Sequence, residues 1–377
     1  MLKHILWLSG NSAGKYREPN FIPLRLRQFL EMPDYGYIAA VGSGLLVGCG
    51  SIGKRHLSEL LQRYSKVFVV DTNQEVRRNL EIKFGNQVSA YSAISELPKT
   101  ELDLAVISTW GPDHLSHLRS VLMIRPRFIL IEKPLESSLY KVSQISRLLQ
   151  DSKVPYAVNF SLRYNEQFNK ILPLASKYNL GKITNISVSG GANCVSTNGI
   201  HYLDFFMTLL KTFPESVMAD LRNDQINPRN RDLSFFGGVA TWRLKNGVSV
   251  TLDFSNSSYS QPRVLIFFER GLIDIYSESM KVFSNNDMKQ MKDLPITRTK
   301  VFDQELETLN LADPAYLDGI TILYSKICSS DSDLKFDDQI EGTKQILLAC
   351  ISSKLERKVY ADETFSEELL MHDWKIS

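Results

Sequence analysis

The chain has 377 residues, more than one hydrophobic core usually serves, so two domains are expected. Its 44 basic and 42 acidic residues are spread along the sequence and give a formal net charge of +2, which favours neither nucleic acid nor a membrane surface as a partner. No apolar run is long enough to span a bilayer, and the start of the chain lacks the cleavage-site pattern of a signal peptide.

Residues 1–43 form an extension in front of the first predicted strand. They include three prolines, Pro19, Pro23 and Pro33, and show no sustained hydrophobic period. The run Gly10–Lys15 resembles a phosphate-binding loop but has one residue too few between its glycines and no Ser or Thr after the lysine, so we reject that interpretation. We expect an arm that packs on the body of the protein or on a neighbouring subunit.

A glycine-rich turn follows the first apolar run, Leu45–Cys49. Gly48, Gly50 and Gly53 have the spacing G-x-G-x-x-G, and residues Ile52–Tyr64 show the period of an amphipathic helix. In this motif the first glycine permits a tight turn, the second lets the backbone approach a pyrophosphate, and the third lets helix and strand pack closely. The pyrophosphate then lies on the free amides at the helix N-terminus.

A second apolar run, Val67–Asp71, ends in a carboxylate 18 residues after Gly53. An acidic residue at about this distance binds the ribose hydroxyls of a dinucleotide. The carboxylate of Asp71 fits a free 2′-hydroxyl and repels a 2′-phosphate, so NAD is the expected cofactor. Arg77 and Arg78 lie close enough in the sequence to leave NADP open.

Apolar strands alternate with amphipathic helices up to residue 160. This alternation predicts a parallel sheet with right-handed crossovers, and ligands of such a sheet bind beyond the carboxyl ends of its strands. We therefore expect an α/β Rossmann domain over residues 44–160. Its predicted strands are Leu45–Cys49, Val67–Asp71, Val88–Tyr91, Leu102–Ser108, Phe128–Ile131 and Tyr156–Phe160.

Two polar segments follow predicted strands at this edge. Ser108–His114 comes after one strand, and Glu132, Lys133 and Pro134 come after the next. A lysine that ends a buried strand at a ligand edge is a candidate functional residue, and Pro134 is a candidate for a cis peptide bond. The alternative is an ordinary strand exit with a surface lysine, and spacing alone does not separate the two.

The second half predicts a different architecture, an α+β domain over residues 161–377 with a mainly antiparallel, open sheet. Two hairpins are expected, around Asn246-Gly247 and around Arg270-Gly271, with further strands at Ile183–Ser189 and Ser216–Leu221. An open sheet face favours dimer formation. Helices are expected at Arg163–Tyr178, Gly199–Lys211, Ala315–Ser329 and Asp337–Leu355.

Five motifs in this order resemble the glucose–fructose oxidoreductase, inositol dehydrogenase and MocA (Gfo/Idh/MocA) family. They are VGCGSIGKRH (47–56), STWGPDH (108–114), IEKPLESS (131–138), VNFSLRYN (158–165) and NGIHYLDFF (198–206), and residues 336–360 are similar to the family's C-terminal helix. The resemblance implies an NAD(P)-dependent oxidoreductase that acts on a hydroxyl or keto carbon of a sugar, sugar nucleotide or cyclitol. It also implies a homodimer or homotetramer formed through the second sheet. A cytoplasmic location is expected from the four widely separated cysteines, which have no C-x-x-C spacing.

By position in these motifs, Lys133 corresponds to the family's active-site lysine and His201 to its catalytic histidine. An imidazole can accept the hydroxyl proton while hydride leaves the carbon, and an ammonium stabilises the developing alkoxide. The substrate-binding residues implied are Lys133, Arg163, Tyr164, Thr197, Asn198 and His201. The expected cofactor-binding residues are Gly48, Gly50, Ser51, Ile52, Gly53, Asp71, Ser108, Thr109, His114, Glu132 and Lys133.

One position departs from the family pattern, which usually has an aspartate four residues before the histidine where this chain has Thr197. The segment between the Ile183 strand and His201 is also short. Two other functions therefore stay open: a non-catalytic regulator that binds a dinucleotide, and an NAD-using glycoside hydrolase or lyase.

The remaining histidines and cysteines are expected to be structural. His114 and His117 lie three residues apart near Asp113, but no further ligand has suitable spacing, so no metal site is expected. His56 follows the glycine turn and has no predicted partner. The cysteines show no C-x-x-C spacing and are expected to be reduced thiols, at Cys49, Cys194, Cys328 and Cys350.

Overall fold

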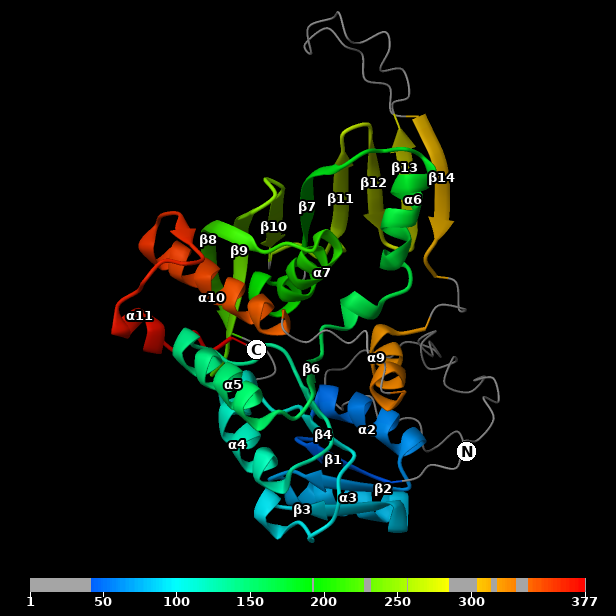
Figure 1. The fold of residues 1–377 in the computed structure, drawn as a ribbon, viewed down its shortest axis with the longest axis vertical. Coiled ribbons are helices and arrows are strands. Elements are labelled where there is room, and N and C mark those ends of the chain that lie inside the picture. The colour runs from blue at the N-terminus through cyan, green and yellow to red at the C-terminus, as the bar shows by residue number, and fades with distance from the viewer. Residues whose placement is uncertain are drawn as a thin grey trace, which may run out of the picture.

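The computed structural model contains two β-sheets, one above the other in Figure 1. It describes residues 42–191, 193–226, 232–255, 257–284, 304–312, 317–329 and 338–376. Apart from its last two residues, the expected N-terminal extension lies outside the described residues. Among the described residues, no helix has the length and apolar character needed to cross a membrane.

The first sheet has six parallel strands in the order β3-β2-β1-β4-β5-β6. Its central strands are buried on both faces, because helices cover each side and leave no solvent-facing row. The strands are β1 (Ser43–Val47), β2 (Lys66–Val70), β3 (Val88–Tyr91), β4 (Leu104–Ile107), β5 (Ile129–Ile131) and β6 (Tyr156–Val158). The connecting helices are α2 (Ser51–Arg63), α3 (Gln74–Phe84), α4 (His114–Ile124) and α5 (Leu139–Ser152).

The strand order reverses between β1 and β4, which are neighbours in the sheet. The chain runs outward from β1 through β2 to β3, then returns to β4 and runs outward on the other side. The glycine turn after β1 and the segment 108–114 after β4 therefore lie side by side at the switch point. Such a crevice is where open parallel sheets bind their ligands. The expected α/β Rossmann fold is confirmed.

The second sheet has nine strands in the order β14-β13-β12-β11-β7-β10-β9-β8-β15. The β7–β10 pair is parallel and the other pairs are antiparallel, which confirms a mainly antiparallel sheet. Its strands are β7 (Ile183–Gly191), β8 (Pro214–Ile226), β9 (Ser234–Leu244), β10 (Ser249–Ser255), β11 (Arg263–Phe268), β12 (Gly271–Tyr276), β13 (Ser279–Ser284), β14 (Gln304–Asn310) and β15 (Val359–Tyr360). Both expected hairpins form, whereas β13, β14 and β15 had no predicted counterpart.

Helices α7 (Ile200–Leu210) and α10 (Gln339–Leu355) lie against one face of this sheet (Figure 1). α10 buries side chains around its whole circumference, from Gln339 to Ser352. The short helix α11 (Glu367–Met371) follows near the C-terminus, where the Trp374 amide donates to the Ser137 carbonyl at 2.9 Å. The end of the chain is thereby fixed beside the segment that follows β5.

The helix expected over Arg163–Tyr178 is wrong in its first half. A 3₁₀ turn covers Ser161–Tyr164, and an α-helix, α6, covers only Ile171–Lys177. The Asn165 side chain accepts the amide of Gln167 at 2.9 Å, which offers the backbone an alternative to the helix.

Helix α9 (Gly319–Cys328) belongs to the second half of the sequence but packs on α2 of the first sheet (Figure 1). Thr321 Oγ1 donates to Glu59 Oε1 at 2.9 Å, and Arg55 pairs with Asp318 at 2.6 Å. Its apolar side chains join the hydrophobic cluster around β1, β2 and α2, at Ile320, Leu323, Tyr324 and Ile327.

The turn between β9 and β10 gives a direct test of the hairpin. Gly247 has a φ of +85°, which an L-residue adopts at a cost of about 1 kcal/mol or more. We expect Gly247→Ala to lower the free energy of unfolding by about that amount in urea denaturation. The exposed neighbour Lys245 serves as control, and Lys245→Ala should leave stability unchanged. Equal stability of both variants would contradict the assigned turn.

Candidate functional site

The glycine turn has the geometry that a bound pyrophosphate requires. Gly48 has a φ of +87°, and its amide donates to the Val70 carbonyl at 2.8 Å. A Cβ at Gly53 would stand 2.2 Å from the Gly48 carbonyl oxygen, so only glycine permits this helix–strand contact. A Cβ at Gly50 would meet no atom within 4 Å, which leaves open space above the turn.

The N-terminus of α2 faces this turn without competing groups. Among the described residues no side chain caps its first amides, and its first turn, which begins at Ser51 and Ile52, contains no acidic residue. A helix N-terminus in this state attracts an anion through its amides and its dipole. The described residues of the turn therefore fit a dinucleotide phosphate.

Asp71 lies beside the turn, as the motif requires. Its Oδ2 accepts the Cys49 amide and its Oδ1 accepts the Asn73 amide, each at 2.8 Å, so the carboxylate is held at the ends of β1 and β2. Arg77 Nη1 donates to the Asp71 carbonyl at 2.7 Å and to the Thr72 carbonyl at 2.9 Å. These bonds hold the Arg77 side chain on the main chain, and the Arg78 side chain is exposed. The charged group that faces a ribose at this point is therefore the Asp71 carboxylate.

The segment after β4 braces the turn from the other side of the switch point. Ser108 Oγ donates to the Gly48 carbonyl at 2.7 Å, and Thr109 Oγ1 lies 3.1 Å from His117 Nδ1. His114 Nε2 donates to the Thr109 carbonyl at 3.0 Å, and burial lowers the pKa of His114. Ser108, Thr109 and His114 thus shape the cofactor crevice through bonds within the protein.

Lys133 and His201 come from different parts of the fold, Lys133 from the end of β5 in the first sheet and His201 from α7, which packs on the second sheet. Lys133 follows β5, and its Nζ donates to the Thr197 carbonyl at 3.1 Å. Thr197 lies in a π-helical turn, Val195–Gly199, that leads directly into α7, whose second residue is His201. The Lys133–Pro134 peptide bond is cis, as the sequence indicated. Lys133, Thr197 and His201 therefore form one cluster at the carboxyl edge of the parallel sheet.

His201 is uncharged in this setting. Burial, the positive charge of Lys133 and, less strongly, that of Arg55 lower the pKa of His201 from its ordinary 6.5 to about 3. Its Nδ1 is buried and has no hydrogen-bond partner in the described part of the chain, and the same holds for Thr197 Oγ1. Buried polar atoms without partners are rare, so these two are candidates for contact with a ligand.

Arg163, Tyr164 and Asn198 have protein partners in the structure. Arg163 binds both carboxyl oxygens of Asp204, which is fully buried, and donates to Asp338 at 2.9 Å. Burial alone would lower the pKa of Arg163, but the Asp204 carboxylate raises it. Tyr164 packs on the cluster that contains α9, and Asn198 Oδ1 accepts the Cys194 amide at 3.3 Å. Their contacts with a substrate stay a prediction.

Sequence reasoning missed the partners of Glu132. This carboxylate is buried and accepts His56 Nε2 at 2.7 Å and Asn159 Nδ2 at 2.6 Å. Burial alone would raise the pKa of Glu132, but His56, Lys133 and Asn159 together lower it to about 2. The available signal was weak: His56 lies three residues after Gly53, and its partners lie far along the chain.

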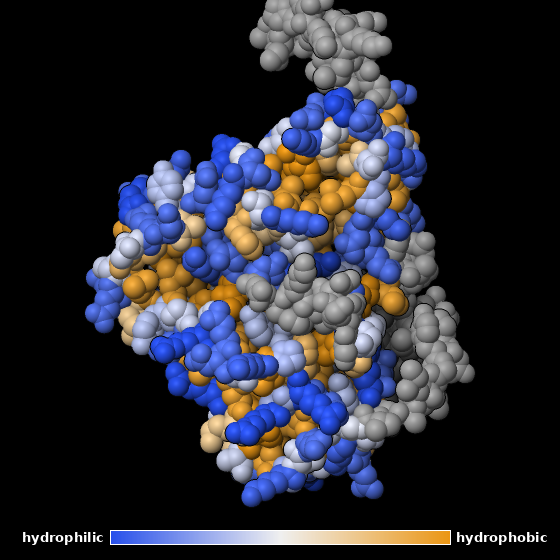
Figure 2. All heavy atoms as spheres, in the orientation of Figure 1, coloured by the Kyte–Doolittle hydropathy of each residue, from blue (hydrophilic) through white to orange (hydrophobic). Residues whose placement is uncertain are grey.

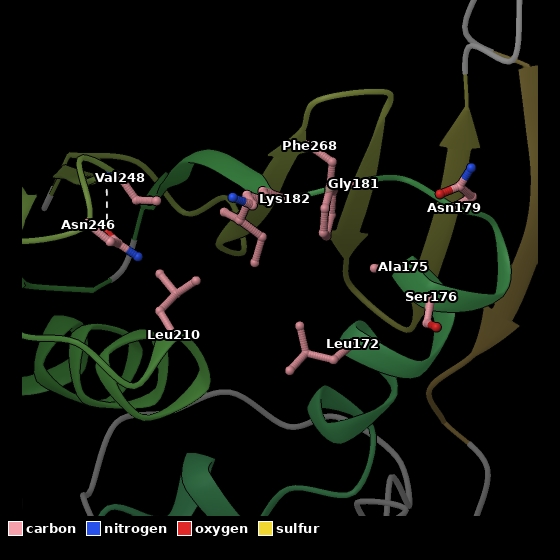
Figure 3. A pocket seen from close by; sticks show the side chains of 11 residues that line it. Leu172, Ala175, Ser176, Asn179, Gly181, Lys182, Leu210, Asn246, Val248 and Phe268 are labelled. Atoms are coloured by element: carbon pink, nitrogen blue, oxygen red, sulfur yellow. Dashed lines mark hydrogen bonds between the residues drawn. The ribbon is translucent and has the colours of Figure 1, made fainter.

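A pocket of about 600 Å³ lies elsewhere, at the end of the second sheet (Figure 3). Side chains of α6, of the end of α7 and of the turn after β9 surround it, including Leu172, Leu210 and Asn246. Hydrophobic side chains are visible at the surface in this part of the molecule, near α6 (Figure 2). None of the predicted site residues lines this pocket. Among the described residues no group of three potential metal ligands occurs.

Residues 44–160 match the model of the Gfo/Idh/MocA family, described as an oxidoreductase family with an NAD-binding Rossmann fold. No curated protein is detectably similar to the chain in sequence.

Solved structures share the fold over most of the chain. Myo-inositol 2-dehydrogenase from Lactobacillus plantarum has a TM-score of 0.63 at 16% identity, covering 85% of this chain and 99% of its own. UDP-N-acetylglucosamine 3-dehydrogenase from Acidithiobacillus ferrooxidans has a TM-score of 0.61 at 14% identity, covering 83% and 97%. The super-repressor mutant of Gal80p from Saccharomyces cerevisiae has a TM-score of 0.64 at 12% identity, covering 89% and 100%.

The two glycines of the turn form a matched pair for mutation. Gly50→Ala places a methyl group in open space and should weaken NADH binding at least about tenfold while leaving the melting temperature unchanged. Gly53→Ala drives a Cβ against the Gly48 carbonyl and should lower the melting temperature. NADH fluorescence titration and thermal unfolding measure the two effects. Full NADH affinity in Gly50→Ala would contradict the placement of the pyrophosphate.

The low pKa of His201 gives a pH dependence with a defined sign. The unfolded chain takes up this proton near pH 6.5 and the folded protein only near pH 3, so stability falls as pH decreases through this range. We expect His201→Gln to lose less stability than the wild type between pH 7 and pH 4. Parallel urea denaturation at several pH values measures the difference, and identical pH dependence of the two proteins would refute the buried neutral state.

Proposed function

The chain carries the NAD-binding Rossmann domain of the Gfo/Idh/MocA oxidoreductases, and from this premise we propose that it is an NAD-dependent dehydrogenase of sugar hydroxyl groups. The observation that supports this most is the 3.1 Å bond from Lys133 Nζ to the Thr197 carbonyl. It holds the Lys133 ammonium near a neutral His201 at the carboxyl edge of the parallel sheet. A cation and a proton acceptor at one place suit the oxidation of an alcohol.

Bound NAD supplies a hydride acceptor at this edge of the sheet, and the residues of the chain handle the proton and the charge. The neutral imidazole of His201 accepts the proton of the substrate hydroxyl as the hydride leaves the carbon. The Lys133 ammonium stabilises the negative charge that develops on the oxygen. Lys133 lowers the pKa of His201 through its positive charge. The negative charge on the substrate oxygen offsets that effect, so the imidazole becomes more basic as the reaction proceeds.

The substrate we propose is a sugar, a sugar nucleotide or a cyclitol. The support is the shared fold of the inositol and UDP-N-acetylglucosamine dehydrogenases, combined with the retained lysine and histidine. The buried Thr197 hydroxyl and His201 Nδ1, both without partners, suit a substrate rich in hydroxyl groups.

We further propose that the outer face of the second sheet joins two copies of the chain. Met218, Val239 and Tyr276 are 48%, 40% and 46% exposed, and the cross-strand register places them on the same face of the sheet. Met218 and Val239 lie on neighbouring strands and Tyr276 lies on β12, and exposed apolar side chains on an open sheet face favour burial against a second copy. The expected species is a homodimer or a tetramer built from it.

A second candidate is a regulator that binds the dinucleotide without turnover. Thr197 stands where the family usually has an aspartate, and the fold is shared with the Gal80p super-repressor. A third is an NAD-using hydrolase or lyase, in which the cofactor is restored. The dehydrogenase accumulates NADH on addition of substrate, whereas the other two do not.

The dehydrogenase is tested by Lys133→Met and His201→Asn in a screen of sugars, sugar nucleotides and cyclitols at 340 nm. Each variant should lose roughly 10²–10⁴-fold in kcat, because each removes a group that acts on the reacting oxygen. NADH affinity should change little in His201→Asn, since the expected pyrophosphate and ribose contacts lie elsewhere. The exposed Lys99 provides a control, Lys99→Met. Undiminished turnover in both site variants would refute the assignment.

A further inference from the structure

A chain of buried hydrogen bonds connects α9 to the main chain of Lys133. The Tyr324 hydroxyl lies 2.8 Å from His56 Nδ1, and His56 Nε2 lies 2.7 Å from Glu132 Oε1. The other carboxylate oxygen, Oε2, accepts the Lys133 amide at 3.1 Å. Tyr324 and His56 are fully buried, and Glu132 is 4% exposed. The chain thus begins on a helix from the second half of the sequence and ends at the proposed active-site lysine.

The two ends of this chain of hydrogen bonds have defined protonation states. Tyr324 keeps its proton, because burial raises the pKa of its hydroxyl. Glu132 is ionised and accepts hydrogen bonds only. His56 Nε2 therefore donates to the carboxylate, and the Tyr324 hydroxyl is the partner of His56 Nδ1. Removing the tyrosine hydroxyl would leave Nδ1 without a partner and free the imidazole to turn.

Three hydrogen bonds hold the Glu132 carboxylate in position. Its Oε1 takes His56 and Asn159, and its Oε2 takes the Lys133 amide. A shift of the carboxylate therefore shifts the backbone from which the Lys133 side chain extends. Lys133 Nζ reaches across to the Thr197 carbonyl, so its position beside His201 depends on where that backbone lies.

Two further contacts between α9 and α2 involve neither Lys133 nor Glu132 in the described hydrogen bonds. Thr321 bonds Glu59, and Arg63 Nη2 lies 3.4 Å from the Ser325 hydroxyl, both further along α2. These contacts attach the same two helices and do not involve Glu132. A substitution at one of these contacts therefore weakens the packing of α9 on α2 without altering the hydrogen bonds of Glu132.

We propose that Tyr324 and His56 are positioning residues for Lys133, which hold the Glu132 carboxylate and through it the backbone of the lysine. The inference rests on the proposed function only in taking Lys133 as the group that faces the reacting oxygen. It gives α9 a role in the active site although none of its residues contacts Lys133 in the described hydrogen bonds.

The experiment compares Tyr324→Phe with Thr321→Val, which each remove one hydroxyl from α9. Lysines are labelled by reductive methylation with ¹³C-formaldehyde, and the Lys133 signal is identified by its loss in Lys133→Arg. We expect Tyr324→Phe to move the Lys133 signal and its pH midpoint, whereas Thr321→Val leaves both in place. Where a substrate has been found, kcat should fall about tenfold or more in Tyr324→Phe with KM and NADH affinity unchanged, as for a small misplacement of a catalytic group.

A His56 series provides a second measurement. His56→Gln retains a donor that can reach Glu132 and should disturb the Lys133 signal less than His56→Leu. If His56→Leu does not fold, the Tyr324→Phe result decides alone. An unmoved Lys133 signal in Tyr324→Phe, with thermal stability reduced as in Thr321→Val, would overturn the proposal. A moved signal in a protein that turns over no sugar would refute the dehydrogenase and still support the positioning.

Discussion

The geometry of the site depends on the buried, ionised carboxylate of Glu132. A charge in this position is costly unless hydrogen bonds surround it, and here His56, Asn159 and the Lys133 amide supply them. These partners come from α2, from the end of β6 and from the turn after β5. The buried charge of Glu132 therefore binds groups from three segments of the Rossmann domain, one of which is the backbone amide of Lys133.

Glu132 follows β5, at the same edge of the sheet as the crevice of the switch point. The switch point between β1 and β4 opens a crevice that the glycine turn lines on one side and the Ser108 segment on the other. The phosphate-binding amides of α2 lie at the start of the same helix that carries His56. Helix α2 therefore carries both the amides that face the glycine turn and the histidine that binds Glu132.

Local patterns in the sequence predicted most of the first sheet and the glycine turn. Period-2 and period-3.6 hydrophobicity is set by neighbours along the chain, so the six strands were located within about two residues. The failure at Arg163–Tyr178 arose where tertiary contacts override helix propensity, because Arg163 is drawn into a buried pair with Asp204. Strand β14 is predominantly polar, so no hydrophobic period marks it in the sequence.

The pairing around Glu132 could not be predicted in the same way. His56 and Glu132 are 76 residues apart, and His56 and Tyr324 are 268 residues apart, so no spacing rule connects them. The expected roles of Gly48, Gly53 and Asp71 follow from a local motif, whereas the contact of Lys133 with Thr197 requires both sheets to be in place. Local motifs therefore predict the cofactor, whereas the proximity of Lys133 to His201 depends on tertiary contacts.

The most direct test of the central claim is a fluorescence titration of the purified protein with NADH and, in parallel, with NADPH. We expect saturable binding of one NADH per chain and much weaker binding of NADPH, because the Asp71 carboxylate at the end of β2 would repel a 2′-phosphate. Equal affinity for the two would contradict the assignment of Asp71. Binding of neither would contradict the dinucleotide site itself and with it the proposed dehydrogenase.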